Sequence, residues 1–181
     1  MPFIGNQPTA VPLTGADLTD GIITPAKLST TLDLSSKTIT LPAGVGGKVL
    51  QVVTNTTGTS TYTTNTTWTQ TALFVNITPS SSSNKILVMA DGNLDSAVTA
   101  TLGHASIFRD STNLGNSTGG MLVSYGQNSR VIAGATPTIL DSPNSTATIT
   151  YRVYVKATGS AVDWNGQSCL ASITAMEISA W

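Results

Sequence analysis

The clearest alternation of apolar and polar positions in the chain runs from residue 147 to residue 156. Its apolar positions are Ala147, Ile149, Tyr151, Val153 and Val155. A period of two is that of a β-strand with one buried face and one face toward water. Residues 147–156 are therefore predicted to form a half-buried strand with a wet outer face.

Shorter apolar runs predict eight more strands, and clusters of turn-forming residues separate them. The predicted strands are 49–53, 73–77, 85–90, 105–109, 121–125, 130–133, 138–140 and 170–178. The predicted turns are 78–84, 91–93, 110–113 and 141–144. Many short strands with regularly spaced turns are typical of antiparallel sandwiches and jelly rolls. The expected fold class is all-β, an antiparallel β-sandwich or jelly roll.

Two of the predicted strands are apolar on both faces. They are residues 86–90 and much of 169–178. A strand with two apolar faces lies between two layers. In a single sandwich the outer layer would have to come from the chain's own loops, whereas in an oligomer a neighbouring subunit could supply it. Both interpretations remain open from the sequence.

The first 44 residues differ from the rest and are predicted to form an extended, irregular segment. Five prolines interrupt them, so long helices are not expected. Apolar residues recur there at an interval of five, at Leu13, Leu18, Ile23 and Leu28. This interval fits neither a helix nor a strand. These anchors would need burial on trimer partners or a particle surface, so we expect an N-terminal attachment and trimerisation segment (1–44) and a C-terminal sandwich (45–181).

The chain is poor in charge, which bears on its partners. Charged residues make up 9% of the sequence and the net charge is −1, against about 25% charged residues in a typical protein. A neutral surface favours hiding much of it against identical subunits; an adequately soluble monomer is the alternative. The eight basic residues are scattered, which excludes a phosphate-binding stripe for nucleic acid. No stretch is apolar enough for membrane insertion, and the start lacks the features of a secretion signal.

Catalytic chemistry finds little support in the sequence. His104 is the single histidine, and no Gly-x-Ser-x-Gly elbow is present. Cys169 is predicted to be a small buried apolar residue in a strand. Residues 91–95 place oxygens at alternate positions without the downstream Glu of a calcium loop, and they are more typical of a turn. We expect no catalytic residue, no cofactor and no metal.

Three residues are candidates for contact with a ligand. Asp163 stands beside Trp164, and an aromatic face next to a carboxylate can hold a sugar ring; the alternative is that Trp164 packs at a strand end. Tyr125 begins a polar stretch suited to glycans or to plain solvation. Trp181 is either an interface anchor or a loose end.

Several segments together resemble the fibre proteins of tailed bacteriophages, especially short, cyanophage-like trimeric fibres of phages of aquatic bacteria. The segments are 12–28, 46–53, 77–88, 140–151 and 173–178. The resemblance covers most of the chain. It implies a non-enzymatic homotrimer with a globular β tip, which is assembled in the host cytoplasm and placed on the virion surface. Its N-terminal segment would bind a capsid, neck or tail protein, and its tip would contact a host surface glycan.

The resemblance leaves the position on the particle open. A chain of 181 residues without a long shaft is short for a tail fibre, which favours a short fibre or a capsid decoration protein (a head fibre). A polysaccharide depolymerase is a distant alternative, because glycoside hydrolysis needs two carboxyl groups that face each other across a sugar.

Overall fold

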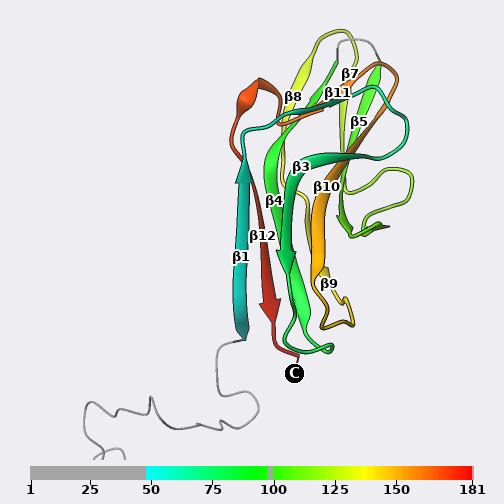
Figure 1. Cartoon of the computed structure of the whole chain (residues 1–181). Coiled ribbons are helices and arrows are strands. Elements are labelled where there is room, and N and C mark those ends of the chain that lie inside the picture. The colour runs from blue at the N-terminus through cyan, green and yellow to red at the C-terminus, as the bar shows by residue number, and fades with distance from the viewer. Residues whose placement is uncertain (1–47, 98–99, 181) are drawn as a thin grey trace, which may run out of the picture. The chain divides into compact units, whose positions relative to one another are not determined.

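The structure, a computed structural model, describes residues 48–97 and 100–180. The predictions for the N-terminal segment and its boundary at residue 44, for the anchors Leu13, Leu18, Ile23 and Leu28, and for Trp181 lie outside the described residues. The described part is all-β apart from one short 3-10 turn, with two antiparallel sheets packed face to face (Figure 1). No helix in the described part is long and apolar enough to cross a membrane.

The larger sheet has seven strands and is organised around β4 (Lys85–Ser96). The first half of β4 pairs with β12 (Ala171–Ile178) on one side and with β9 (Thr138–Asp141) on the other. Its second half pairs with β11 (Val162–Trp164) and with β8 (Val131–Ala135). The outer strands are β1 (Val49–Thr57), next to β12, and β2 (Thr61–Thr63), next to β11.

The smaller sheet has five strands, with β10 (Ile149–Thr158) at its centre. On one side β10 pairs with β3 (Thr69–Ile77), and on the other with β5 (Thr101–Arg109). The far side of β5 pairs with β6 (Thr112–Asn113) and β7 (Leu122–Gly126).

The connectivity is that of an eight-stranded jelly roll. β8 and β9 follow each other along one side of β4, as β11 and β12 do along the other, so each pair counts as one strand. Without the short β2 and β6, the larger sheet then has the order first, eighth, third, sixth along the chain, and the smaller sheet second, seventh, fourth, fifth. This interleaving of two sheets is the jelly-roll arrangement, and the predicted fold class is confirmed.

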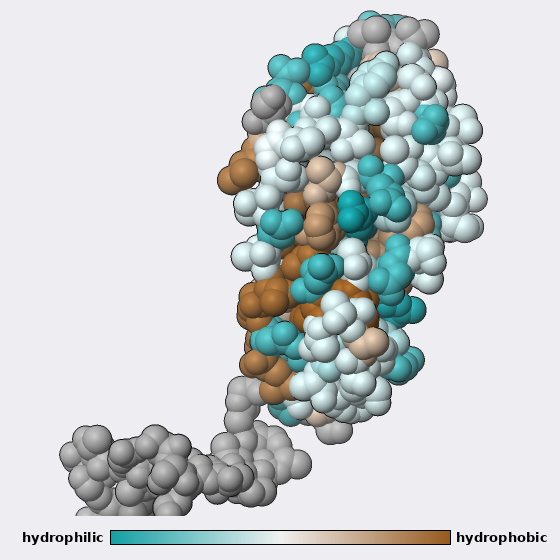
Figure 2. All heavy atoms as spheres, in the orientation of Figure 1, coloured by the Kyte–Doolittle hydropathy of each residue, from teal (hydrophilic) through white to brown (hydrophobic). Residues whose placement is uncertain are grey.

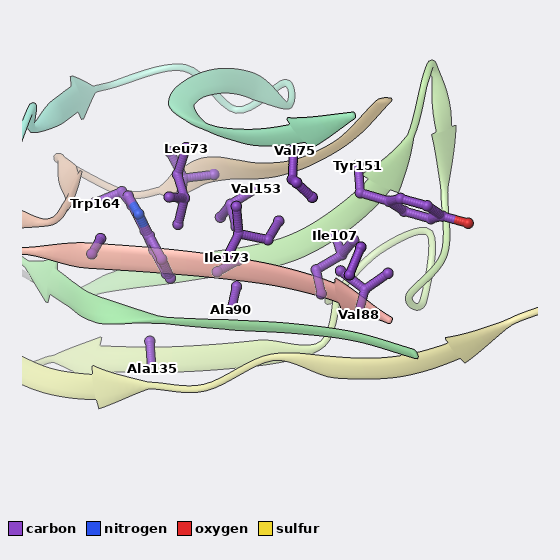
Figure 3. Packing of buried hydrophobic residues seen from close by; sticks show 14 of the residues in the cluster. Leu73, Val75, Val88, Ala90, Ile107, Ala135, Tyr151, Val153, Trp164 and Ile173 are labelled. Carbon is purple, nitrogen blue, oxygen red and sulfur yellow. The ribbon is translucent and has the colours of Figure 1, made fainter. Parts of the chain in front are cut away.

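The core lies between the two sheets and follows the alternation of the strands. In β10 the side chains of Ile149, Tyr151, Val153 and Val155 are buried, as the pattern predicts. They meet residues of the facing sheet such as Val88, Ala90 and Ile173 (Figure 3). Full burial of one such large side chain stabilises the fold by roughly 1.5–3 kcal/mol.

The nine predicted strands are all present, mostly longer than predicted, and β2, β6 and β11 were missed. Two local predictions are wrong. Residues 91–93 do not turn but continue β4, because that strand has paired neighbours on both sides. Cys169 is not a buried strand residue but is exposed in the connection between β11 and β12.

Part of the outer face of the smaller sheet, over β5 and β10, is covered by the chain itself, so it is drier there than predicted. The rings of Phe108 and Tyr154 stack there with centroids 4.0 Å apart, and Trp68 meets Phe108 edge-on at 5.6 Å. The ammonium group of Lys156 lies 4.7 Å from the centroid of the Trp68 ring. Aromatic and cation–π contacts of this kind hold loop residues on a sheet face.

The described part has two distinct ends. Its first residue, Lys48, accepts a hydrogen bond of 2.8 Å from the backbone N–H of Ser179, so both termini of the described part lie at one end. The strands β8 and β11 pair with the second half of β4 and lie at the other end (Figure 1).

Candidate binding cavity and apolar sheet face

A cavity of about 200 Å³ lies on the larger sheet at the end opposite the termini. Three of its lining residues stand in one row across adjacent strands, because Asp163 of β11 is in register with Tyr62 of β2 and with Asp95 of β4. Side chains in register on neighbouring strands have Cβ atoms about 5 Å apart. Arg130 and the small residues Ala97, Ala161 and Val162 complete the lining.

Asp95 is held by Arg130, which directly precedes β8. The guanidinium Nε donates to both carboxylate oxygens of Asp95, at 2.9 and 2.8 Å, and Nη2 donates to Oδ2 as well. The hydrogen bond and the charge of Asp95 raise the pKa of Arg130. Gln167, with its amide oxygen turned toward Arg130, accepts a further hydrogen bond at 2.9 Å. Asp95 is therefore buried with its charge balanced.

The second carboxylate of the cavity, Asp163, is less well satisfied. Burial, followed by the charge of Asp95, raises the pKa of Asp163, against a backbone hydrogen bond from Thr61 and the charge of Arg130. Its Oδ1 is buried and has no hydrogen-bond partner. A buried polar atom without a partner costs free energy, so this side chain is not placed for stability.

Unsatisfied polar atoms and residues with positive φ cluster around β11 and the turn that follows it, close in sequence to Asp163. Among the described residues, the buried side-chain polar atoms without a partner are Asn93 Oδ1, Asp163 Oδ1, Trp164 Nε1 and Asn165 Oδ1. Asn165 and Gln167, just after β11, have φ values of 61° and 67°, a region that few residues other than glycine adopt. Such departures from local rules concentrate at functional sites.

The structure separates the residues that the sequence nominated as ligand contacts. Asp163 lines the cavity. Trp164 does not, because neighbouring strand residues face opposite sides and its indole is fully buried in the core (Figure 3). Tyr125 is exposed on β7 of the smaller sheet and is not part of the cavity lining. Trp164 is thus corrected from a ligand contact to a packing residue.

Tyr62 and Arg130 were not recognised from the sequence, and Asp95 was weighed only as part of residues 91–95, which lack the downstream Glu of a calcium loop. They come from three separate segments that only the sheet brings together. The one available signal was Tyr62 itself, an isolated aromatic residue in a run of threonines.

The side chain of the single histidine, a residue that often acts in catalysis, takes part in packing. His104 is buried on β5, its Nδ1 lies 3.3 Å from the carbonyl oxygen of Gly119 and its Nε2 lies 3.3 Å from Thr158 Oγ1. Burial lowers the pKa of His104. Within the described ranges no three His, Cys, Asp or Glu residues come together as metal ligands would.

A second surface feature is the outer face of the larger sheet at the end near the termini. One row across four strands is entirely apolar, since Val52 of β1 pairs with Met176, Met176 with Leu87, and Leu87 with Leu140 of β9. Val52 is 54% exposed, and Leu140, Val49 and Leu50 are exposed to a similar extent. Figure 2 shows apolar atoms gathered over the lower part of β1 and β12. We call this row together with Val49 and Leu50 the apolar face.

The prediction of two apolar sides is confirmed for residues 86–90 but only in part for 169–178, because Ser172 and Thr174 of β12 share the outward side with Met176 and Ile178. Ile86, Val88 and Ala90 point into the core, while Leu87 and Met89 are half-buried on the other side. In the described part, no loop of the chain covers this face as the Trp68 and Phe108 contacts cover the smaller sheet.

No protein-family model and no curated protein matches the chain. Among solved structures, a chain of infectious bursal disease virus, Gx strain, matches with a TM-score of 0.40 and 12% identity over 80% of this chain. A mutant VP2 protein of the same virus, from derived T=1 particles, matches with a TM-score of 0.36 and 11% identity over 79% of this chain. The chain spans 41% of the length of each of these two solved chains. At this level of similarity neither match assigns a function.

Proposed function

We propose that the chain is a non-enzymatic structural protein of a virus particle: a short homotrimeric fibre on the surface of a tailed phage that contacts the host. The observation that carries the proposal is the apolar face, which the described residues of one copy leave exposed. The placement on a phage particle is supported by the resemblance of the segments 12–28 and 77–88 to phage fibre proteins.

The apolar face suits self-association. Contiguous apolar patches on a soluble protein mark interaction sites, and each Å² removed from water contributes roughly 25 cal/mol. Val52, Met176, Leu87 and Leu140 form an uninterrupted row. With 9% charged residues in the chain, there is little charge elsewhere to keep separate copies apart.

The two-ended architecture supports a fibre tip. Lys48 and Ser179 meet at one end, so the chain enters and leaves the sandwich there. The opposite end, with β2, β8 and β11, carries neither terminus of the described part. A subunit attached through residues that precede Lys48 can present that end to the host.

The oligomeric state tests the apolar face. The mass of the full chain in solution, measured by light scattering, is expected to be three times the 18.6 kDa of one chain. Val52→Lys places a charge in the apolar row and is expected to shift the mass toward one chain. The matched control is Val123→Lys, because Val123 is also 54% exposed and also lies on an outer strand, β7 of the other sheet; this variant is expected to remain a trimer.

A wild-type chain that stays monomeric at micromolar concentration would overturn the trimer. Equal dissociation of both variants would show that the apolar face is not part of the interface.

The position of the protein on the particle is tested by the number of copies seen in images of purified virions. A few trimers at the tail or neck support a fibre, whereas many copies over the shell indicate capsid decoration. Release of reducing sugar from host polysaccharide would contradict a non-enzymatic role.

A further inference from the structure

We infer that the cavity lined by Tyr62, Asp163 and the Asp95–Arg130 pair is a saccharide site that takes one neutral sugar ring. The inference deepens the host-contact part of the proposed function and depends on it for its biological meaning, but its physical basis is separate from the apolar face.

Tyr62 provides a surface for the ring. It is 67% exposed, although burial of so large an aromatic side chain would be favourable. It sits on the short outer strand β2, where the backbone fixes its position beside Asp163. An exposed, positioned aromatic ring at the rim of a cavity offers a flat apolar surface to the C–H face of a sugar.

The polar side of the cavity provides acceptors and donors for hydroxyl groups. Asp163 lacks a partner for Oδ1, and the broad χ2 torsion of aspartate lets the carboxylate turn an oxygen toward an incoming hydroxyl. Arg130 is about half exposed beyond its contacts with Asp95, so N–H groups of the guanidinium are within reach of a hydroxyl oxygen. The aromatic ring can therefore contact the C–H face of a sugar, while the carboxylate and the guanidinium, about one strand spacing away, contact its hydroxyl groups.

The size of the cavity limits the ligand. Its volume is about 200 Å³, below the roughly 300–1,000 Å³ of sites for drug-sized ligands. Ala97 and Ala161 contribute only small side chains to the lining, and Val162 turns its side chain toward Gly103 of the facing sheet, which leaves room for a single ring. A longer glycan would extend from this ring into solvent at the free end of the sandwich.

The same geometry favours binding over cleavage. Retaining glycoside hydrolases place a nucleophilic carboxylate about 5 Å from an acid, and Asp95 and Asp163 are neighbours in register. Both oxygens of Asp95, however, accept hydrogen bonds from Arg130, and the side chain is buried. Asp95 therefore positions Arg130 and is not free to attack a sugar.

The test is a titration of the full-length chain with the methyl glycosides of glucose, galactose, mannose and N-acetylglucosamine. Binding is measured by ligand-observed NMR. At least one glycoside is expected to bind with a millimolar Kd. Tyr62→Ala is expected to weaken binding about fivefold through loss of stacking. Asp163→Asn is expected to weaken it by a similar factor, about fivefold, because a charge-assisted hydrogen bond becomes a neutral one.

The matched control is Tyr125→Ala, which removes an exposed tyrosine from the other sheet and is expected to leave Kd unchanged. Methylammonium is the alternative probe, because an organic cation could also bind the carboxylate of Asp163, whose Oδ1 has no hydrogen-bond partner. No binding of any glycoside at millimolar concentration, equal effects of Tyr62→Ala and Tyr125→Ala, or binding of methylammonium alone would each overturn the inference. Light scattering on the same samples tests the trimer independently of sugar binding. A chain that is monomeric and still binds a sugar would contradict the proposed function but would support the saccharide site.

Discussion

At the scale of single residues, the carboxyl groups of the buried Glu177 and the half-buried Asp163 lie in opposite environments. Glu177 of β12 accepts hydrogen bonds from Gln51 Nε2 at 2.6 Å, from Asn84 Nδ2 at 2.6 Å, and from the backbone N–H and Oγ of Ser80, both at 2.7 Å. Burial by itself raises the pKa of Glu177, but these bonds outweigh it and lower the pKa to about 2. Asp163 has a backbone hydrogen bond from Thr61, but burial and the charge of Asp95 outweigh it, and the pKa of Asp163 is raised. Glu177 therefore stabilises the fold, whereas Asp163 is a cost consistent with a binding role.

Glu177→Gln is expected to lower the free energy of unfolding by about 2 kcal/mol, because the amide NH₂ would face donors that the carboxylate now satisfies. Urea unfolding at neutral pH measures this loss. A change within experimental error would show that the network around Glu177 contributes nothing.

Glu177→Gln is also expected to change how the free energy of unfolding depends on pH. The folded pKa of Glu177, about 2, lies below the ordinary value of 4.5, so its stabilisation is complete above about pH 4.5 and is lost as the pH falls toward 2. The wild-type chain is therefore expected to lose stability across this range more steeply than Glu177→Gln does. Parallel curves for the two proteins would contradict the assignment.

At the scale of elements, β4 decides the shape of the sandwich. It is long enough to pair with β12 and β9 in one half and with β11 and β8 in the other. Gly92 lies where the two halves meet, directly against the indole of Trp164. Because Gly92 has no side chain, the indole of Trp164 can pack directly against it in the core.

Gly92→Ala is expected to destabilise the fold by about 1–3 kcal/mol through overpacking, because its Cβ would lie 2.8 Å from Cζ2 of Trp164. Gly134→Ala is the matched control on the neighbouring strand β8, where a Cβ would meet nothing within 4 Å. The control is expected to be neutral, or stabilising by up to about 1 kcal/mol. Thermal melts compare the two, and equal shifts would contradict the packing of Trp164 against Gly92.

At the scale of the whole molecule, the proposed trimer would depend on apolar contact in a chain with few charges. The apolar row from Val52 to Leu140 contains no ionisable side chain. Contacts between exposed charges are screened within about 10 Å at 0.1 M salt, whereas apolar association is maintained or strengthened by salting-out salts.

The mass of the assembled protein is therefore expected to be the same in low and in molar sodium chloride, and sodium sulfate is expected to favour assembly. Light scattering across a salt series measures this. Dissociation into single chains as sodium chloride rises would show that ion pairs, and not the apolar face, hold the copies together.

The alternation of apolar and polar side chains by itself determined much of the fold. A period of two at residues 147–156 is a local property, because successive residues of a strand face opposite sides whatever lies around them. The buried face of β10 follows from it, and shorter apolar runs between turn-forming residues located the other eight main strands. The double-sided apolar character of 86–90 follows in the same way, and it already pointed to a covering layer.

Tertiary structure alone decided which residues meet. Tyr62, Asp95, Arg130 and Asp163 are brought together by pairing between strands distant in sequence, and nothing local encodes that register. The same holds for the turn predicted at 91–93, where two flanking strands overrode the turn preference of Asp, Gly and Asn. Asp163 and Trp164 looked like partners because they are adjacent in sequence, but adjacent residues of a strand point to opposite sides of the sheet, so one reached the cavity and the other the core.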